Sequence, residues 1–133
     1  MNFIRRANRK ESKFMNTTAK FFREFASDWQ SGWNSHDLDA IMKHYRSDVV
    51  FRSRKAVALM GTGEIVGVKN LRTYWSKALK QQPKLRFKLM DVFYGHQMMV
   101  ISYENHHNIR AAETLYFDEN GHIFQAAACH CDP

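Results

Sequence analysis

The chain has 133 residues, a formal net charge of +7, 44% hydrophobic residues and 14% aromatic residues. This composition is typical of a globular domain and excludes wholesale disorder. No apolar run approaches the ~20 residues that are needed to span a bilayer. Residues 1–14 hold five basic side chains and one acidic side chain, a net +4 that leaves +3 for the rest. We therefore interpret residues 1–16 as a basic, disordered leader and residues 17–133 as a single domain.

The charge and the cysteines also limit the possible partners. Beyond the leader the net charge is ordinary, and no basic stripe with interleaved exposed aromatic residues occurs, so we predict no nucleic-acid partner and no membrane partner. A weaker alternative is that the leader tethers the domain to an acidic partner. Cys129 and Cys131 are too close in sequence for good disulfide geometry. Free thiols favour a cytoplasmic location.

Three amphipathic helices are predicted in the first two thirds of the chain. The first is capped by Thr17 or Thr18 and ends at Asn34, and its apolar residues recur at spacings of three and four. The second begins with acidic residues in its first turn and closes near Ser47. The third runs from about residue 68 to residue 80 and ends before Pro83. The inner faces consist of Phe22, Phe25, Trp29 and Trp33 in the first helix, and of Leu38, Ile41, Met42 and Tyr45 in the second.

The remaining segments are predicted to form strands and turns. Residues 49–53 form a first strand, residues 54–63 a loop and residues 64–67 a short strand or turn. From residue 84 the chain is strand-like, with a bulge near Met90 and further strands over 97–105, 109–117 and 122–130. This order predicts an α+β fold in which three helices from the N-terminal half pack on a curved antiparallel sheet and enclose a pocket.

Three motifs occur in a family-specific order. Residues 33–51 include WNSHDLDAI, HY and SDVVF, residues 63–75 include two glycines and LRTYW, and residues 113–121 read ETLYFDENG. Together they resemble SnoaL-like domains of the nuclear transport factor 2-like superfamily over about residues 19–130. The resemblance implies a cone-shaped α+β barrel and commonly a homodimer through the outer sheet face. This fold hosts isomerases, epoxide hydrolases, cyclases, dehydratases and binding modules, so the resemblance does not fix a reaction.

The resemblance also permits a comparison with ketosteroid isomerases. Those enzymes use a carboxylate base, together with a protonated acid and a tyrosine that form an oxyanion hole. The base position matches Ser53, the oxyanion tyrosine matches Trp29, and the acid matches Glu113. Supporting tyrosines match Tyr45, which is retained, and Trp75, which is changed. Because the base is lost, ketosteroid isomerisation by that mechanism is not expected.

Glu113 is the candidate that the residue pattern itself singles out. It shares an inward strand face with Ala111, Leu115 and Phe117. A carboxyl on an apolar face must be paired, hydrogen-bonded or protonated, and burial raises its pKa. Such a group acts as a general acid or binds a ligand. The alternative is a structural acid that is satisfied by a tryptophan N–H, by Tyr45 or by water, and both interpretations stay open.

The other candidates surround Glu113 on neighbouring elements. We name Glu113 and Tyr45 as catalytic candidates. The aromatic residues could line a cavity for a ring-bearing ligand, although such stripes are more often plain core, and in this fold core and cavity wall overlap. His130 is expected on the inward face of the last strand with Phe124, Ala126 and Ala128. If Ala126 lies opposite Glu113, His130 is ~13 Å further along, as a ligand contact or as a plain rim residue. The ligand-binding candidates are Trp29, Ser53, Trp75, Phe87, Tyr103 and His130.

Other kinds of site lack their motifs in this sequence. His36 and Asp37 are better explained by helix capping than by catalysis. The spacing of a structural zinc site, a phosphate loop, a dinucleotide fingerprint and a nucleophile elbow are all missing, so we predict no metal and no cofactor. The leading hypothesis is a protein that binds a small, mostly apolar cyclic molecule, with cofactor-free acid–base chemistry (isomerisation, dehydration or cyclisation) if it is an enzyme. The alternative is a non-catalytic ligand-binding or dimerisation module in which Glu113 is structural.

Overall fold

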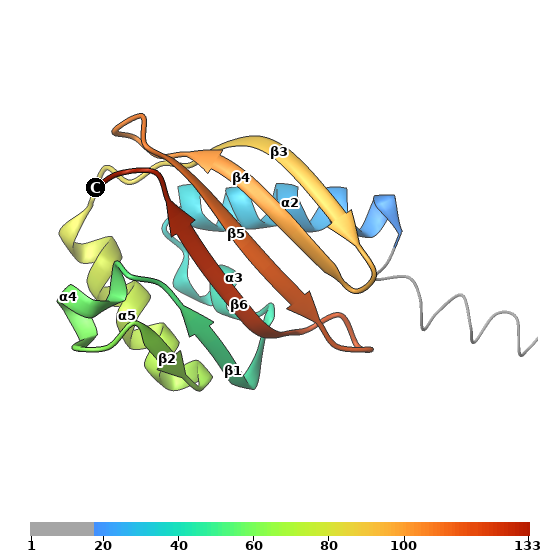
Figure 1. The fold of residues 1–133 in the computed structure, drawn as a ribbon, viewed down its shortest axis with the longest axis horizontal. Helices are drawn as coiled ribbons and strands as arrows, with labels where there is room; N and C mark the ends of the chain where they lie inside the picture. The colour runs from blue at the N-terminus through green and yellow to red at the C-terminus, as the bar shows by residue number, and fades with distance from the viewer. Residues whose placement is uncertain (1–17) are drawn as a thin grey trace, which may run out of the picture.

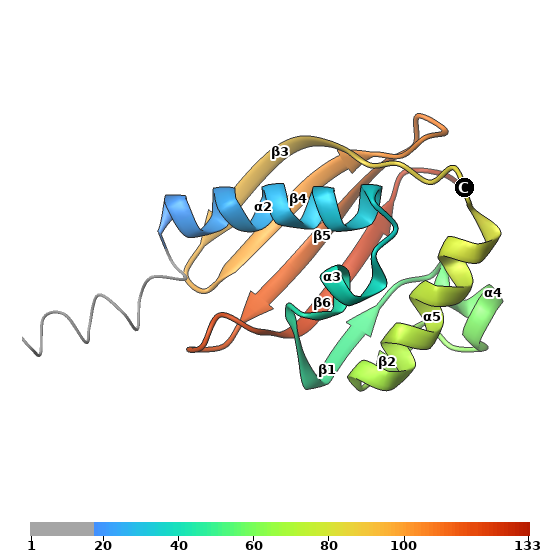
Figure 2. The ribbon, with the colours of Figure 1, turned by 180° about the vertical axis from the view of Figure 1, so that it is seen from behind.

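The computed structural model describes residues 18–133, in which three helices cover one face of a six-stranded sheet (Figure 1). Seen from behind, α2 crosses the β3–β5 side of the sheet, and α5 lies over the β1–β2 side with α3 between them (Figure 2). No helix of the described part is long and apolar enough to cross a membrane. The helices are α2 (Ala19–Asn34), α3 (Leu38–Met42), α4 (Ala56–Met60) and α5 (Val68–Gln81).

The sheet is curved and does not close on itself. Its strand order is β2-β1-β6-β5-β4-β3, and all neighbours are antiparallel except β1 and β6, which run parallel. The predicted fold class, helices packed on a curved sheet, is confirmed, with this one parallel pair as a difference. A parallel pair needs a long crossover, which the chain between β1 and β6 supplies. The strands are β1 (Tyr45–Arg52), β2 (Glu64–Val66), β3 (Lys88–Gly95), β4 (Met98–Glu104), β5 (Arg110–Phe117) and β6 (Ile123–His130).

The first helix forms as its sequence pattern predicts. The Thr18 hydroxyl accepts a hydrogen bond from the Phe21 N–H at 3.2 Å and so satisfies one of the free donors of the first turn. The predicted apolar stripe of α2 is buried throughout. The predicted leader, residues 1–16, and the alternative cap Thr17 lie outside the described residues.

The second helix is shorter than predicted, and Tyr45 belongs to a strand. α3 ends at Met42, and Tyr45 opens β1, where it pairs with Ile123 of β6. The Ile123 N–H donates to the His44 carbonyl at 2.8 Å, so pairing with β6 overrides the helical spacing of the sequence. The predicted loop over 54–63 also contains the short helix α4, which ends at Gly61 with a left-handed φ of 73°.

The register between β5 and β6 also differs from the prediction. Glu113 lies opposite Ala128, not Ala126. The turn closes with a hydrogen bond from the Asp118 N–H to the His122 carbonyl at 2.7 Å, and a bulge follows between Tyr116 and Phe117. Together these shift the pairing by two residues.

The bulge changes the surroundings of two further β6 residues. The ring of Phe124 lies 6.4 Å from that of Tyr116, which is exposed, so its predicted inward position is wrong. His130 now follows Ala128 by only two positions and is closer to Glu113 than predicted.

Candidate functional site

A cavity of about 300 Å³ lies between α5, the inner face of the sheet and the segment that joins α5 to β3. Its inner wall is largely aromatic and aliphatic, and its more exposed wall is polar. The lining residues are Trp33, Phe51, Ser53, Lys55, Tyr74, Trp75, Ala78, Gln82, Leu85, Phe87, Tyr103, Asn105, His107, Ile109, Ala111, Glu113, Ala128 and His130.

Glu113 projects from β5 into this cavity and is only 3% exposed. The indole Nε1 of Trp29 donates to its Oε2 at 3.2 Å. Burial raises the pKa of the carboxyl to about 7, although the Trp29 hydrogen bond lowers it. That indole is its one side-chain hydrogen-bond partner among residues 18–133, which leaves Oε1 for a ligand or water. Near neutral pH the group can therefore both donate and accept a proton.

Ser53 is the second buried polar side chain of the site. It follows β1, is 4% exposed, and accepts a hydrogen bond from the Lys55 N–H at 3.2 Å. In residues 18–133 the buried residues with polar or charged side chains are Ser53 and Glu113, and both line this cavity. Each of the two has a hydrogen-bond partner, as buried polar groups require: the Lys55 N–H for Ser53 and the Trp29 indole for Glu113.

Three tyrosines near Glu113 differ in their access to the cavity. Tyr103 and Tyr74 line it, and burial raises the pKa of both hydroxyls. A hydrogen bond with Ser53 counters part of that effect for Tyr74, a residue that the sequence analysis missed. Tyr45 does not line the cavity and lies behind Trp75, with ring centroids 5.1 Å apart.

Tyr45 thus has no direct route to a ligand. Its hydroxyl is buried without a hydrogen-bond partner among the described residues. Burial, with a further contribution from the charge of Glu113, raises its pKa well above 10. Tyr45 was named as a catalytic candidate, and the structure places it outside the cavity lining, behind Trp75.

The predicted aromatic wall also contains residues that line the cavity and one that does not. Trp75, Phe87 and Tyr103 line the cavity, whereas Trp29 lies behind it. Trp29 stacks on Phe87 with centroids 5.5 Å apart and an angle of 13°, and its indole holds Glu113. Five of the predicted ligand-binding residues therefore meet Glu113 at one cavity, and Trp29 supports them from the second layer.

The segment 85–87 is held in place by Asn34, the last residue of α2, and by His36, for which the sequence analysis predicts a capping role. The Asn34 amide exchanges two hydrogen bonds with the Phe87 backbone, at 2.7 Å and 2.9 Å. His36 Nε2 donates to the Leu85 carbonyl at 2.7 Å. Asp37 alone acts as the predicted cap, accepting from the Ala40 N–H at 3.1 Å. These contacts explain why β3 begins at Lys88, later than the predicted residue 84, because the Leu85 carbonyl and the Phe87 backbone are bonded to His36 and Asn34 and not to a strand.

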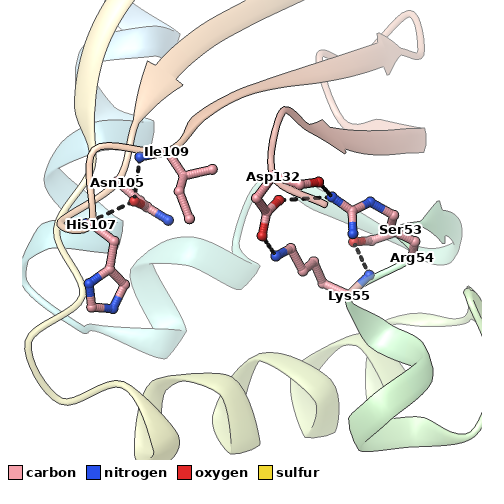
Figure 3. Close-up of polar contacts among 7 residues, drawn as sticks. All are labelled: Ser53, Arg54, Lys55, Asn105, His107, Ile109 and Asp132. Carbon is pink, nitrogen blue, oxygen red and sulfur yellow. Dashed lines mark hydrogen bonds and ion pairs between the residues drawn. The ribbon is translucent and has the colours of Figure 1, made fainter.

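The half-exposed lining residues mark the open end of the cavity (Figure 3). On one side the Asn105 carboxamide accepts from the N–H groups of His107 and Ile109 at 2.9 Å and 3.0 Å, which closes a turn. On the other side Lys55 contacts Asp132. No sequence motif predicts that these residues belong to the site, because they come together only when the sheet has folded.

His130 lines the same end, as predicted for a rim residue. Its Nδ1 is buried and has no hydrogen-bond partner among the described residues. Burial and then the charge of Lys55 lower the pKa of its imidazole, so the ring is neutral at neutral pH.

A helical layer on a curved, unclosed sheet is the fold of nuclear transport factor 2-like α+β proteins. The chain belongs to the SnoaL-like domain family, whose sequence model matches residues 26–128. The resemblance drawn from the sequence motifs is thereby confirmed. No curated protein matches the chain.

Solved structures support the same assignment. A SnoaL-like protein of unknown function from Burkholderia thailandensis E264 superimposes with a TM-score of 0.83 and 29% identity, over 87% of this chain and 98% of that chain. A candidate polyketide cyclase from Sinorhizobium meliloti has a TM-score of 0.64 and 12% identity, over 76% and 89%. A candidate isomerase of the SnoaL-like family from Agrobacterium tumefaciens C58 has a TM-score of 0.67 and 12% identity, over 84% and 97%. The last two likenesses show the fold alone.

Proposed function

We propose that the chain binds a small, mostly apolar cyclic molecule in the cavity and that Glu113 supplies its main polar contact. The observation that carries the proposal is that Ser53 and Glu113, the two buried polar side chains of the described part of the chain, line one aromatic-walled cavity. Ligand sites typically combine an apolar wall with a few polar groups that fix orientation. At about 300 Å³ the cavity is at the small end of such sites and suits a molecule of one or two rings.

The chemistry that these groups support is acid–base catalysis without a cofactor, of the isomerase, dehydratase or cyclase type. A protonated Glu113 would donate to a carbonyl or hydroxyl oxygen of the ligand, and the ionised form would accept a proton. The raised pKa of Tyr103 keeps its hydroxyl protonated as a second donor. The names of the cyclase and isomerase relatives are compatible with this class. The alternative is a non-catalytic binding module, favoured by the Trp29–Glu113 hydrogen bond, which also serves a structural acid.

A thermal-shift screen of small cyclic carbonyl compounds against wild type and Ala128→Phe tests the binding proposal. Ala128 lines the cavity opposite Glu113, so a phenyl ring there would occupy the ligand's space. A ligand at 100 times its Kd adds about 2.7 kcal/mol of stability to the wild type and should raise its Tm by several degrees. The same compound should leave the Tm of Ala128→Phe unchanged. Equal shifts in both proteins, or no shift with any compound, would contradict binding in this cavity.

We also propose a homodimer that forms through the outer face of the sheet. Phe93, Val100, Thr114 and Ala127 lie side by side across β3, β4, β5 and β6. On β4, β5 and β6 they alternate with buried residues that face the helices, and on β3 the ring of Tyr94, next to Phe93, stacks on Phe22 of α2. The four residues therefore point to the uncovered side. Phe93 is 60% exposed in the single chain, and apolar surface of this kind typically marks an interface. The two free cysteines support our proposal of a cytoplasmic location.

A further inference from the structure

We propose that Lys55, which lines the open end of the cavity, forms an anion-binding subsite together with Arg54 beside it, in which the Asp132 carboxylate takes the place of a carboxylate carried by the ligand. The inference rests on the proposed function and narrows its ligand class to cyclic carboxylates. Asp132 follows β6 and reaches across to the segment after β1, which Figure 3 shows.

The contacts of Asp132 are those of a bound carboxylate. Lys55 Nζ contacts Oδ2, and Arg54 Nη2 donates to Oδ1 at 2.8 Å as well as to the Asp132 carbonyl. These bonds hold the Asp132 pKa below its usual range, chiefly through Lys55. The Asp132 side chain is 17% exposed, whereas Arg54 and Lys55 are 49% and 38% exposed and so remain accessible to an anion from solution. An arginine and a lysine around one carboxylate form a recognition site that any carboxylate of similar geometry can use.

The local charges favour an anion over a neutral group. Arg54 and Lys55 are neighbours in sequence and share a single carboxylate, so the cluster keeps one positive charge in excess. His130 lies in the same cavity and is neutral because of its burial and the nearby Lys55. Its unpartnered Nδ1 adds a hydrogen-bonding atom without charge. The adjacent positive charges of Arg54 and Lys55 repel each other, and an anion bound between them lowers that repulsion.

The position of Lys55 connects this cluster to the cavity. Lys55 and Glu113 line the same 300 Å³ space, Lys55 at its half-exposed end and Glu113 at its buried end. A ligand that fills the space therefore meets both. A carboxylate placed near Glu113 would be repelled once that group ionises. The ligand must then place its carboxylate at Lys55 and an uncharged carbonyl or hydroxyl at Glu113, and its carboxylate competes with Asp132.

Binding of 2-naphthoate and its uncharged isostere 2-naphthamide to wild type and Asp132→Asn tests the inference. Both probes are titrated at pH 7 and followed by the fluorescence of the cavity tryptophans. Asp132→Asn removes the competing charge and keeps the shape of the side chain, so 2-naphthoate should bind about threefold to tenfold more tightly. The affinity for 2-naphthamide should not change. Lys55→Gln should weaken 2-naphthoate alone.

A matched control and three outcomes decide the result. Asp39→Asn removes an aspartate that pairs with Arg72 away from the cavity, and it should leave both affinities unchanged. If Asp132→Asn strengthens both probes equally, Asp132 is only a steric cover and the subsite is wrong. If 2-naphthamide binds, and the affinity for 2-naphthoate is the same in wild type, Asp132→Asn and Lys55→Gln, the proposed subsite is wrong while the proposed function stands. If neither probe binds any variant, both are overturned.

Discussion

Glu113→Gln is expected to remove a pH dependence of about 3 kcal/mol from the free energy of unfolding. In the folded protein the pKa of Glu113 is about 7, against an ordinary value of 4.5. The folded state therefore holds the proton more tightly than the unfolded chain, and the stabilising effect is fully present below pH 4.5. It is lost as the pH rises through 7. A difference of 2.5 pH units at about 1.4 kcal/mol each gives the expected magnitude.

Urea unfolding of wild type and Glu113→Gln at pH 5 and pH 8 measures this effect. Glutamine resembles the protonated carboxyl and can still accept from Trp29, so the variant should be close to wild type at pH 5 and more stable than wild type at pH 8. Burial lowers the pKa of His44 to about 4, so protonation of His44 destabilises the folded state at acidic pH. This contribution is the same in both proteins and cancels when their free energies of unfolding are subtracted.

Glu119→Gln, an exposed change in the β5–β6 turn, should follow the wild type at both pH values. A constant difference between wild type and Glu113→Gln across this range would show that the carboxyl is ionised throughout. It would then act as a paired structural anion. Loss of ligand binding in Glu113→Gln without loss of stability would separate the functional role from the structural one.

Thr114→Arg is expected to convert a homodimer into a monomer. Thr114 is central on the outer face, between Val100 of β4 and Ala127 of β6. In a two-fold interface the same surface patch of both copies is buried, so the new charge is buried twice, without a partner and close to Arg52 of its own sheet. Sedimentation equilibrium should give twice the chain mass of 15.7 kDa for the wild type and one chain mass for the variant.

The matched control places the same charge on the opposite side of the molecule. Gln81 is exposed at the end of α5, which covers the other face of the sheet, so Gln81→Arg should remain dimeric. A monomeric wild type would contradict the dimer proposal directly. A dimeric Thr114→Arg would move the interface to another surface.

The elements that the sequence predicted well are those with a strong local signal. The α2 stripe and its Thr18 cap, and the alternation that turns Glu113 inward, depend on residues close together in the chain, and the structure reproduces them. Tyr45 was assigned to a helix because its spacing continued the α3 face. The pairing with β6 that overrides this spacing comes from almost eighty residues away. Such long-range competition is not visible in a local pattern.

The candidate site shows the same division. Glu113, Ser53 and the aromatic wall could be predicted because inward strand positions and one family comparison identify them. Lys55 and Asp132 could not be predicted. Their contact depends on the folded sheet, which brings the loop after β1 next to the chain after β6. The two-residue change in register also needed the structure, because the closure of the turn at Asp118 and His122 and the bulge after Tyr116 together decide which residue lies opposite Glu113.

The pKa of the Glu113 carboxyl, measured by carbon-13 NMR with and without saturating 2-acetylnaphthalene, tests the central claim most directly. We predict a value of about 7 for the free protein. The ligand ketone should raise it further, because a hydrogen bond from the protonated carboxyl to the ketone stabilises the neutral form. An ordinary value near 4.5, or a raised value that the ketone does not change, would contradict a buried proton-holding group that meets its ligand in this cavity.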